Sequence, residues 1–394
     1  METGRTTWAG LALEYDRLAG GTIPADVVLG PSPTTRTLAS LMVQRPVSRA
    51  LDIGTGCGAL ALLASRFADE VVATDVNPRA LAYTSRNAAA NGITNVRCMQ
   101  GSLVEAVADQ RFDLIVGNLP FVVSPATSLT FRDGVRPTSP GTTNPGPTNP
   151  GSPKPASGIC EAAIADSAAI LAGGGVAQFL VNWMVTDPER PYDTPVSWVR
   201  STGCGGLVLL HSLQSPERYV DVWAKNADDD RHRWLAHLAE RNAVAIANGA
   251  VVVHRPIHKG YRPIIRVARM TSPHGRGGDQ IERILGTGSP SDLDIVSGRL
   301  RLVPSTIAEE RHPDGRRLAR IRADDSCGVT AAVPLEQLAL LELLDVRRRL
   351  DDAVGAWTQG TGDRTAESLA ERTAAATATA RHLVAHGLME LDTG

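Results

Sequence analysis

The chain has 394 residues, 43% of them hydrophobic, and a formal net charge of −2 at pH 7. This length allows one large domain or two domains, and the small net charge excludes a general attraction to nucleic acid or to an anionic membrane surface. The five cysteines include no Cys-x-x-Cys pair, which argues against a disulfide framework and a structural zinc site. We therefore expect a cytoplasmic protein that binds no metal.

The first part of the chain, residues 1–46, is predicted to be a mostly helical segment on the substrate side of the site. Within it, "VVLGPSPTTRTLASLM" (27–42) has turn residues that lead into an amphipathic pattern. The first thirty residues show no basic start followed by an apolar run, and no segment offers eighteen uninterrupted apolar residues. We expect neither a signal peptide nor a membrane span.

Residues 47–257 alternate short apolar strands with helical patterns. The stretches "RALDIG", "EVVATDV", "VRCMQGS" and "FDLIVGN" are predicted strands, and "PRALAYTSRNAAANG" is a predicted helix with Pro78 in its first turn and Gly92 at its end. Such alternation with short connections is typical of βαβ units, in which helices cover both faces of a parallel sheet. The predicted fold class is therefore α/β and Rossmann-like.

Two further segments depart from this rhythm. Residues 134–158 are dominated by Pro, Gly, Thr, Asn and Ser, and so few apolar residues predict a flexible insertion. Residues 265–394 contain short strand-like runs over 278–335, then helical patterns over 335–357 and 365–387 and a final short strand. This order predicts a smaller C-terminal α+β domain of winged-helix-like type.

A glycine turn follows the first predicted strand, in "LDIGTGCGAL" (51–60). Gly54, Thr55, Gly56 and Gly58 form a turn whose backbone a ligand can approach closely, and Asp52 precedes it within the strand. A pyrophosphate would be repelled by that acid, whereas the ammonium group of S-adenosyl-L-methionine (SAM) would be attracted. SAM is therefore favoured over a dinucleotide or a turn without a ligand.

The ends of the next two strands support the same interpretation. Asp75 and Val76 end the second strand, where an acid can accept hydrogen bonds from ribose hydroxyls. Ser102 and Leu103 end the third strand and are expected beside the adenine edge. Together with the glycine turn, these residues define the predicted SAM site.

The fourth strand ends in "NLPF" (118–121), and at this point the sequence resembles a known family. It is similar to class I SAM-dependent methyltransferases, within the group whose fourth strand ends in Asn-Pro-Pro-Tyr/Phe. The resemblance covers about residues 27–257, and "VLGPSPTTRTL" also resembles the substrate-side segment of glutamine methyltransferases that act on release factors. The sequence departs from the pattern at Leu119, where the family usually has proline.

The resemblance implies a role for each residue of this motif. Asn118 would contact both SAM and the acceptor, and its side-chain oxygen would accept an N–H bond from a planar nitrogen. A backbone carbonyl near Leu119 would accept the second N–H bond, so that the nitrogen points at the methyl group. Pro120 would stiffen the turn, and Phe121 would lie flat against the planar group.

Five other residues are candidates for substrate binding. Arg132 and Asp133 could hold charged groups of a substrate or form a local surface ion pair. Asn182 and Trp183 end a later strand on the same sheet edge, where Trp183 could cover a cationic group or lie in the core. Tyr15 could cap the pocket.

Three functions remain open at the level of sequence. The first is N-methylation of a guanidinium or amide nitrogen in a small amino-acid-like molecule or a peptide, for which a biosynthetic role in specialised metabolism is natural. The second is methylation of the adenine amine in RNA or DNA, which requires a flipped base. The third is a SAM-binding regulator whose C-terminal domain binds DNA or a partner. The oligomeric state is not determined by the sequence.

Overall fold

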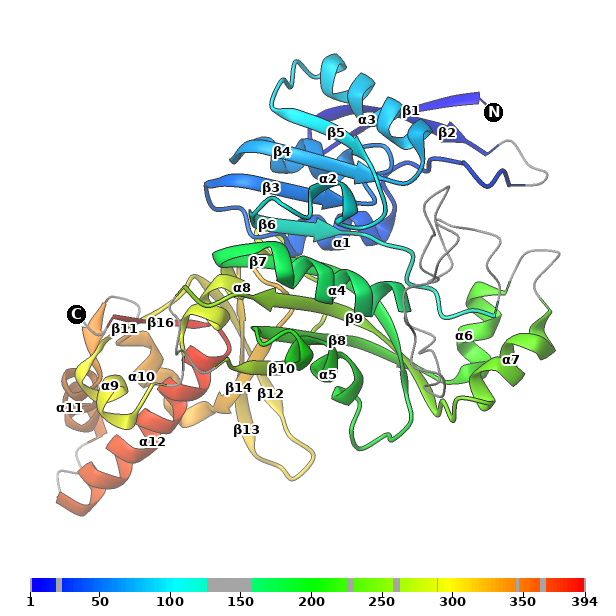
Figure 1. Cartoon of the computed structure of the whole chain (residues 1–394). Coiled ribbons are helices and arrows are strands. Elements are labelled where there is room, and N and C mark those ends of the chain that lie inside the picture. The colour runs from blue at the N-terminus through cyan, green and yellow to red at the C-terminus, as the bar shows by residue number, and fades with distance from the viewer. Residues whose placement is uncertain are drawn as a thin grey trace. The chain divides into compact units, whose positions relative to one another are not determined.

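The computed structural model describes residues 2–18, 23–125, 158–224, 230–257, 263–288, 290–344, 347–361 and 366–392. The chain forms two compact units, Met1–Ala268 and Arg269–Gly394 (Figure 1). Of the predicted insertion at residues 134–158, only Gly158 is described, where a helix begins. No described helix has both the length and the apolar character needed to span a membrane.

The first unit is built on an eight-stranded sheet. Its spatial order is β10-β8-β9-β7-β6-β3-β4-β5. The strands are β3 (Val47–Ile53), β4 (Ala68–Asp75), β5 (Val96–Gln100), β6 (Phe112–Gly117), β7 (Leu171–Val185), β8 (Gly205–Gln214), β9 (Ala245–His254) and β10 (Ile265–Arg269). The pairs formed by β3 to β7 are parallel, and β9 runs antiparallel to both β7 and β8.

The chain reverses its direction of travel across this sheet at β3. It first moves outward through β4 to β5 and then returns to place β6 on the other side of β3. In open α/β sheets, ligands bind at such a switch point, outside the carboxyl ends of the strands. The topology therefore puts the glycine turn after β3 and the Asn118 motif after β6 next to each other.

Helices flank the sheet on both faces, as the alternating pattern predicts (Figure 1). In chain order they are α1 (Pro33–Leu41), α2 (Ala59–Ala64), α3 (Pro78–Ala90), the short 3-10 helix η1 (Glu105–Val107), α4 (Gly158–Ile170), α5 (Asp193–Ser201), α6 (Pro216–Trp223) and α7 (Arg231–Ala239). The α/β, Rossmann-like fold class predicted for this region is thus confirmed.

The prediction of a mostly helical segment over residues 1–46 is wrong. Residues Glu2–Trp8 (β1) and Leu11–Arg17 (β2) form an antiparallel hairpin, and α1 is the helix described in this segment. Ala9 and Gly10 both have positive φ, as a two-residue hairpin turn requires. The alternation of buried and exposed residues along both strands is the signal that the prediction missed.

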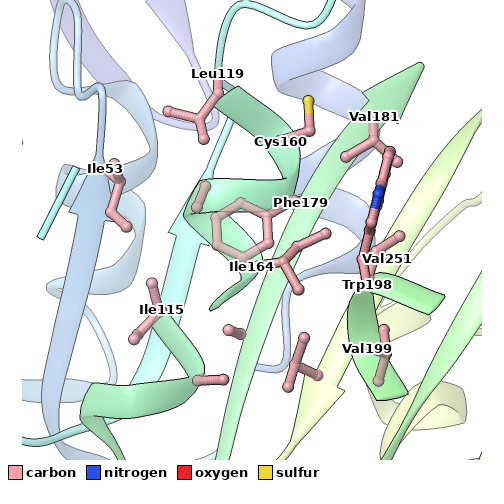
Figure 2. Packing of buried hydrophobic residues seen from close by; sticks show 14 of the residues in the cluster. Ile53, Ile115, Leu119, Cys160, Ile164, Phe179, Val181, Trp198, Val199 and Val251 are labelled. Atoms are coloured by element: carbon pink, nitrogen blue, oxygen red, sulfur yellow. The ribbon is translucent and has the colours of Figure 1, made fainter. Parts of the chain in front are cut away.

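Buried side chains from the sheet and from α4 and α5 form one hydrophobic core cluster. Figure 2 shows Ile115 of β6 and Phe179 of β7 in this cluster with Ile164 of α4. Leu119, in the loop after β6, belongs to the same cluster. Burial of each large apolar side chain contributes about 1.5–3 kcal/mol, so the loop that carries Asn118 is fixed to a rigid core.

The second unit is an α+β domain with its own core. Its elements are α8 (Gly277–Gly286), α9 (Asp292–Ser297), β11 (Arg299–Leu302), β12 (Ser305–Arg311), β13 (Arg317–Ala323), β14 (Thr330–Pro334), η2 (Leu335–Gln337), α10 (Leu338–Glu342), β15 (Arg348–Arg349), α11 (Leu350–Thr361), α12 (Ala366–Ala385) and β16 (Met389–Asp392). The strands form two three-stranded sheets, β15-β11-β16 and β12-β13-β14. The strands β11 to β14 confirm the strand-like runs predicted within 278–335, and α8 and α9 are helices that the prediction did not include. The winged-helix assignment stays a prediction.

Candidate active site

A cavity of about 580 Å³ lies at the switch point of the sheet, at the carboxyl ends of β3, β4 and β6. Its lining comes mainly from five separate segments: residues 27–35, the glycine turn, the end of β4, the end of β5 and the loop after β6. Trp223, the last residue of α6, also lines the cavity. Most of the predicted SAM and motif residues line it, namely Asp52, Gly54, Thr55, Gly56, Asp75, Val76, Ser102, Leu103, Asn118, Leu119, Pro120 and Phe121.

The backbone of the glycine turn is defined by two features, its positive φ angles and its hydrogen bonds to β4. Gly54 and Gly56 have positive φ values of 69° and 58°, which residues with a side chain rarely adopt. The backbone N–H groups of Gly54 and Thr55 both donate to the carbonyl of Thr74 on β4, at 2.8 and 3.0 Å. Gly58 is not part of the lining; it caps the start of α2 with φ of 85°.

Asp52 has one carboxylate oxygen that is satisfied and one that is not. Its Oδ2 accepts bonds from the Thr55 hydroxyl at 2.7 Å and from the Ala61 N–H at 3.0 Å. Its Oδ1 is buried without a hydrogen-bond partner. Burial raises the pKa of the Asp52 carboxyl to about 7, although both hydrogen bonds lower it. Such an orphaned acceptor suits a cation arriving from the cavity.

Asp75 is held by the backbone on both sides. Its Oδ2 accepts the N–H of Gly56 at 3.0 Å, and its Oδ1 accepts the N–H of Asn77 at 2.9 Å. Burial raises the pKa of this carboxyl, against the effect of these backbone bonds. Because each carboxylate oxygen has more than one acceptor site, Asp75 can still accept bonds from two neighbouring hydroxyl groups of a ligand.

The Asn118 side chain has the reverse arrangement, in which the nitrogen is used and the oxygen is not. Its Nδ2 donates to the hydroxyls of Thr34 and Thr35 at 3.3 and 3.2 Å. Its Oδ1 is buried and has no partner. An amide held by its nitrogen at the edge of the cavity presents an oxygen that can accept an N–H bond from a ligand.

Leu119 stands where the Asn-Pro-Pro-Tyr/Phe pattern has proline, and its side chain is buried. Its side chain is 5% exposed and packs in the core cluster seen in Figure 2. A Cβ atom placed on Gly54 would lie 3.2 Å from the Leu119 side chain. The leucine therefore ties the loop after β6 to the glycine turn by packing.

Phe121 contacts Trp223, a cavity residue that the sequence analysis did not predict. The rings of Phe121 and Trp223 are 6.2 Å apart with an interplanar angle of 88°, and both line the cavity. Trp223 is the last residue of α6, about a hundred positions after the motif. Its place in a short amphipathic pattern gave no signal that distinguishes a site residue from a core residue.

The predicted substrate residues have different outcomes. Trp183 is fully buried and donates its indole N–H to the carbonyl of Pro191 at 2.7 Å, so of the two roles left open for it the structure shows the core one, and it does not cover a substrate. Asn182 is 2% exposed and bonds to Tyr219 and Asn248, which makes it part of a buried polar network.

Tyr15 does not line the cavity; its ring packs between Gly4 and Gly30. Gly30 itself is a lining residue, so Tyr15 supports the wall from behind. Arg132 and Asp133 lie outside the described residues. Among the residues that are described, no group of three or more His, Cys, Asp or Glu side chains could hold a metal ion.

Comparison with known proteins agrees with this geometry. Residues 31–133 match the family model of the methyltransferase small domain. The fold, the glycine turn and this match together define a class I SAM-dependent methyltransferase domain, an enzyme class whose cofactor is SAM. The family resemblance and the cofactor predicted from the sequence are thereby confirmed.

Among curated proteins, the chain is similar to release factor glutamine methyltransferases. It is 38% identical over 117 residues to the one from Xylella fastidiosa (strain Temecula1), a match that covers 28% of this chain and 42% of the relative. It is 33% identical over 110 residues to the ribosomal protein L11 methyltransferase of Thermus thermophilus, which covers 27% of this chain and 43% of the relative. The chain thus spans less than half the length of these relatives.

Among solved structures, the chain is similar to a ribosomal protein L11 methylase from Lactobacillus delbrueckii subsp. bulgaricus. The sequence identity is 18%, the TM-score is 0.31, and the match covers 57% of this chain and 78% of that one.

Proposed function

We propose that this protein is an N-methyltransferase that uses SAM to methylate a planar amide nitrogen in a peptide or protein side chain. The observation that carries the proposal is the buried, unpartnered Oδ1 of Asn118 at the wall of the cavity. These two relatives act, by name, on a release factor and on a ribosomal protein, which favours a protein acceptor over the small molecule considered from the sequence. A cytoplasmic location and a role in biosynthesis stay predictions.

The residues of the cavity fit the cofactor. The unpartnered Oδ1 of Asp52 would accept a bond from the ammonium group, and Asp75 would accept bonds from the ribose hydroxyls. Val76, Ser102 and Leu103 line the same side of the cavity and would flank the adenine. Because Gly54 and Gly56 have positive φ, glycine is favoured at both positions, and no side chain stands between the turn and an approaching ligand. When bound, SAM supplies an electrophilic methyl group on a sulfonium sulfur.

Asn118 would activate the acceptor by orienting it. The lone pair of an amide nitrogen is delocalised, so the nitrogen is a weak nucleophile. An N–H bond to Asn118 Oδ1, with a second to a backbone carbonyl near Leu119, would draw electron density onto the nitrogen and aim it at the methyl group. Held this way, the nitrogen would accept the methyl group as the sulfur leaves with the bonding electron pair, and the nitrogen's proton would then pass to solvent.

Phe121 and Trp223 would form the wall against which the flat acceptor group rests. Their perpendicular rings make an aromatic corner next to Asn118. Contact with aromatic rings of this kind is favourable by about 0.5–1.5 kcal/mol. Pro120 restricts the backbone between Asn118 and Phe121.

A neutral amide suits this wall better than a guanidinium. The carboxylates among the described lining residues are Asp52 and Asp75, and both belong to the side assigned to the cofactor. A guanidinium beside Asn118 would therefore be desolvated without an opposite charge from the described lining, which is unfavourable.

The proposal is tested by offering SAM with a panel of acceptors. The panel contains glutamine-bearing peptides, a purified bacterial release factor, ribosomal protein L11, free arginine, and adenine-containing RNA and single-stranded DNA. Each product is scored by mass spectrometry for a gain of one methyl group on a mapped atom. We expect methylation of a glutamine amide nitrogen in a peptide or protein, and no product with Asn118→Ala.

Two results would contradict the proposal. Methylation of the adenine amine would move the assignment to nucleic acid. SAM binding in equilibrium dialysis without methylation of any acceptor would favour the regulator that the sequence left open.

A further inference from the structure

We infer that Thr34 and Thr35 are positioning residues that fix the Asn118 amide with its oxygen toward the acceptor. The inference rests on the proposed function, because it assigns a purpose to the orientation of Asn118. Both threonines lie at the start of α1, more than eighty positions before Asn118 in the chain, and both line the cavity.

The donors and acceptors around the threonines decide the orientation of the amide. Thr35 Oγ1 accepts the backbone N–H of Ser32 at 3.2 Å and an N–H of Asn118 at 3.2 Å. Its own hydrogen is then free to donate to Ser32 Oγ, 3.1 Å away. Ser32 Oγ in turn lies 2.7 Å from Thr34 Oγ1, the second acceptor for Asn118. The three hydroxyls thus form a connected network.

The opposite orientation of the amide is less favourable in the free protein. With the amide turned round, the threonine hydroxyls could donate to Oδ1, but the two N–H donors would occupy the buried position that Oδ1 now holds and would be unsatisfied. In the observed orientation one acceptor, Oδ1, is unsatisfied. Each unsatisfied buried group costs about 1–3 kcal/mol, so the hydroxyl pair favours the orientation in which Asn118 can accept an N–H bond.

The backbone around these residues makes the network rigid. Ser32 and Thr35 form a capping box at the N-terminus of α1, in which each side chain bonds to the backbone N–H of the other. Pro33 is the first residue of the helix and restricts its φ angle. Thr35 is 8% exposed, so water competes little for its hydroxyl. The start of α1 is therefore a preformed holder for the Asn118 nitrogen.

The test uses the double variant Thr34→Val/Thr35→Val, which preserves shape and removes both hydroxyls. We expect kcat for methyl transfer to fall by about tenfold or more, equivalent to a barrier higher by about 1.4 kcal/mol, while the Kd for SAM stays within about twofold. Thr34→Ser/Thr35→Ser keeps both hydroxyls and should restore most of kcat. Thr37→Val is the matched control, since this hydroxyl of α1 bonds to the carbonyl of Pro33.

A second readout does not depend on any acceptor. In protein labelled with 15N at asparagine, the side-chain signals of Asn118 are identified by their loss in Asn118→Ser. We expect its two N–H protons to exchange slowly with water in the native protein and at least about tenfold faster in the double valine variant, because the threonine bonds protect them. Thr37→Val should leave the exchange unchanged.

The outcomes separate this inference from the proposed function. Unchanged kcat and unchanged exchange in the double valine variant would each overturn the positioning role. If no acceptor is methylated by the native protein, the proposed function fails, and the exchange measurement still decides whether the threonines hold the amide.

Discussion

The two halves of the cavity are built in different ways. The half assigned to the cofactor comes from consecutive strand ends. Hydrogen bonds within the glycine turn and between it and the end of the neighbouring strand β4 hold Asp52, the turn and Asp75. The half assigned to the acceptor joins the start of α1, the loop after β6 and the end of α6. The first half is thus local and generic to the fold, whereas the second depends on the packing of distant segments.

If the two halves are independent, a change in one should leave the other's binding constant nearly unchanged. Four predictions about binding and catalysis test this separation, in order of decreasing effect, and a fifth, about stability, accompanies the third.

The largest effect is expected for Asn118→Ala. Loss of the preorganised acceptor should lower kcat for methyl transfer by about 10²-fold or more, whereas calorimetry should find the Kd for SAM within about threefold of the native value. A proportional loss of SAM binding would show that Asn118 belongs mainly to the cofactor half. Asn118→Asp keeps an oxygen acceptor at this position and should retain more activity than Asn118→Ala.

The next effect is expected for Asp52→Ala, which removes the carboxylate with the free Oδ1. A hydrogen bond to a charged group contributes about 1.5–3 kcal/mol, so the Kd for SAM should rise by about 10- to 100-fold. The KM for the acceptor at saturating SAM should change little. Equal losses for both ligands would mean that the glycine turn also supports the acceptor half.

The third prediction concerns pH. Burial raises the pKa of Asp52 to about 7 in the free protein, and a bound ammonium would lower it. SAM affinity should therefore weaken by up to about tenfold per pH unit below 7. Titration by calorimetry between pH 5.5 and 8.5, about the range that spans this pKa, measures the effect. In Asp52→Asn the dependence should be nearly flat, and a native-like slope there would exclude Asp52 as its source.

The same pKa shift has a consequence for stability without SAM. Because the folded pKa lies above the model value of 3.8, the folded state holds the proton more strongly. The stability contributed by protonated Asp52 is present at low pH and is lost as pH rises through about 7. As the pH rises from about 4 to about 7, the melting temperature of the native protein should fall. In Asp52→Asn it should fall less over the same range.

The smallest effect is expected for Trp223→Ala. Loss of one wall of the aromatic corner should raise the acceptor KM by about three- to tenfold, from a contact of about 0.5–1.5 kcal/mol. The Kd for SAM should stay unchanged, and Trp223→Phe should retain near-native KM. If Trp223→Ala lowered the melting temperature and left the acceptor KM unchanged, Trp223 would have a packing role only and would not form a wall of the acceptor site.

Much of the fold could be read from the sequence because periodicity reports burial directly. The strands around the glycine turn and the helix after Asp75 alternate in a way that fits a parallel sheet. The N-terminal hairpin was missed because its two strands are largely exposed and rich in polar residues, so the alternation of apolar and polar residues along them is weak, and because side chains of α3 stabilise it. The side chains of Asn87 and Asn91 accept hydrogen bonds from the backbone N–H groups of Glu14 and Ala12. Contacts between residues so far apart in the chain cannot be predicted from a local sequence pattern.

The sequence by itself determined which residue types meet at the ends of the strands: the acid before the glycine turn, the acid after β4 and the Asn118 motif after β6. These positions follow from the strand order, since carboxyl ends of parallel strands share one edge. The tertiary structure decided the rest. It buried Trp183 and brought Trp223 to Phe121. It also placed the Thr34 and Thr35 hydroxyls on the Asn118 nitrogen, because contacts between distant segments depend on packing in three dimensions and leave no periodic trace in the chain.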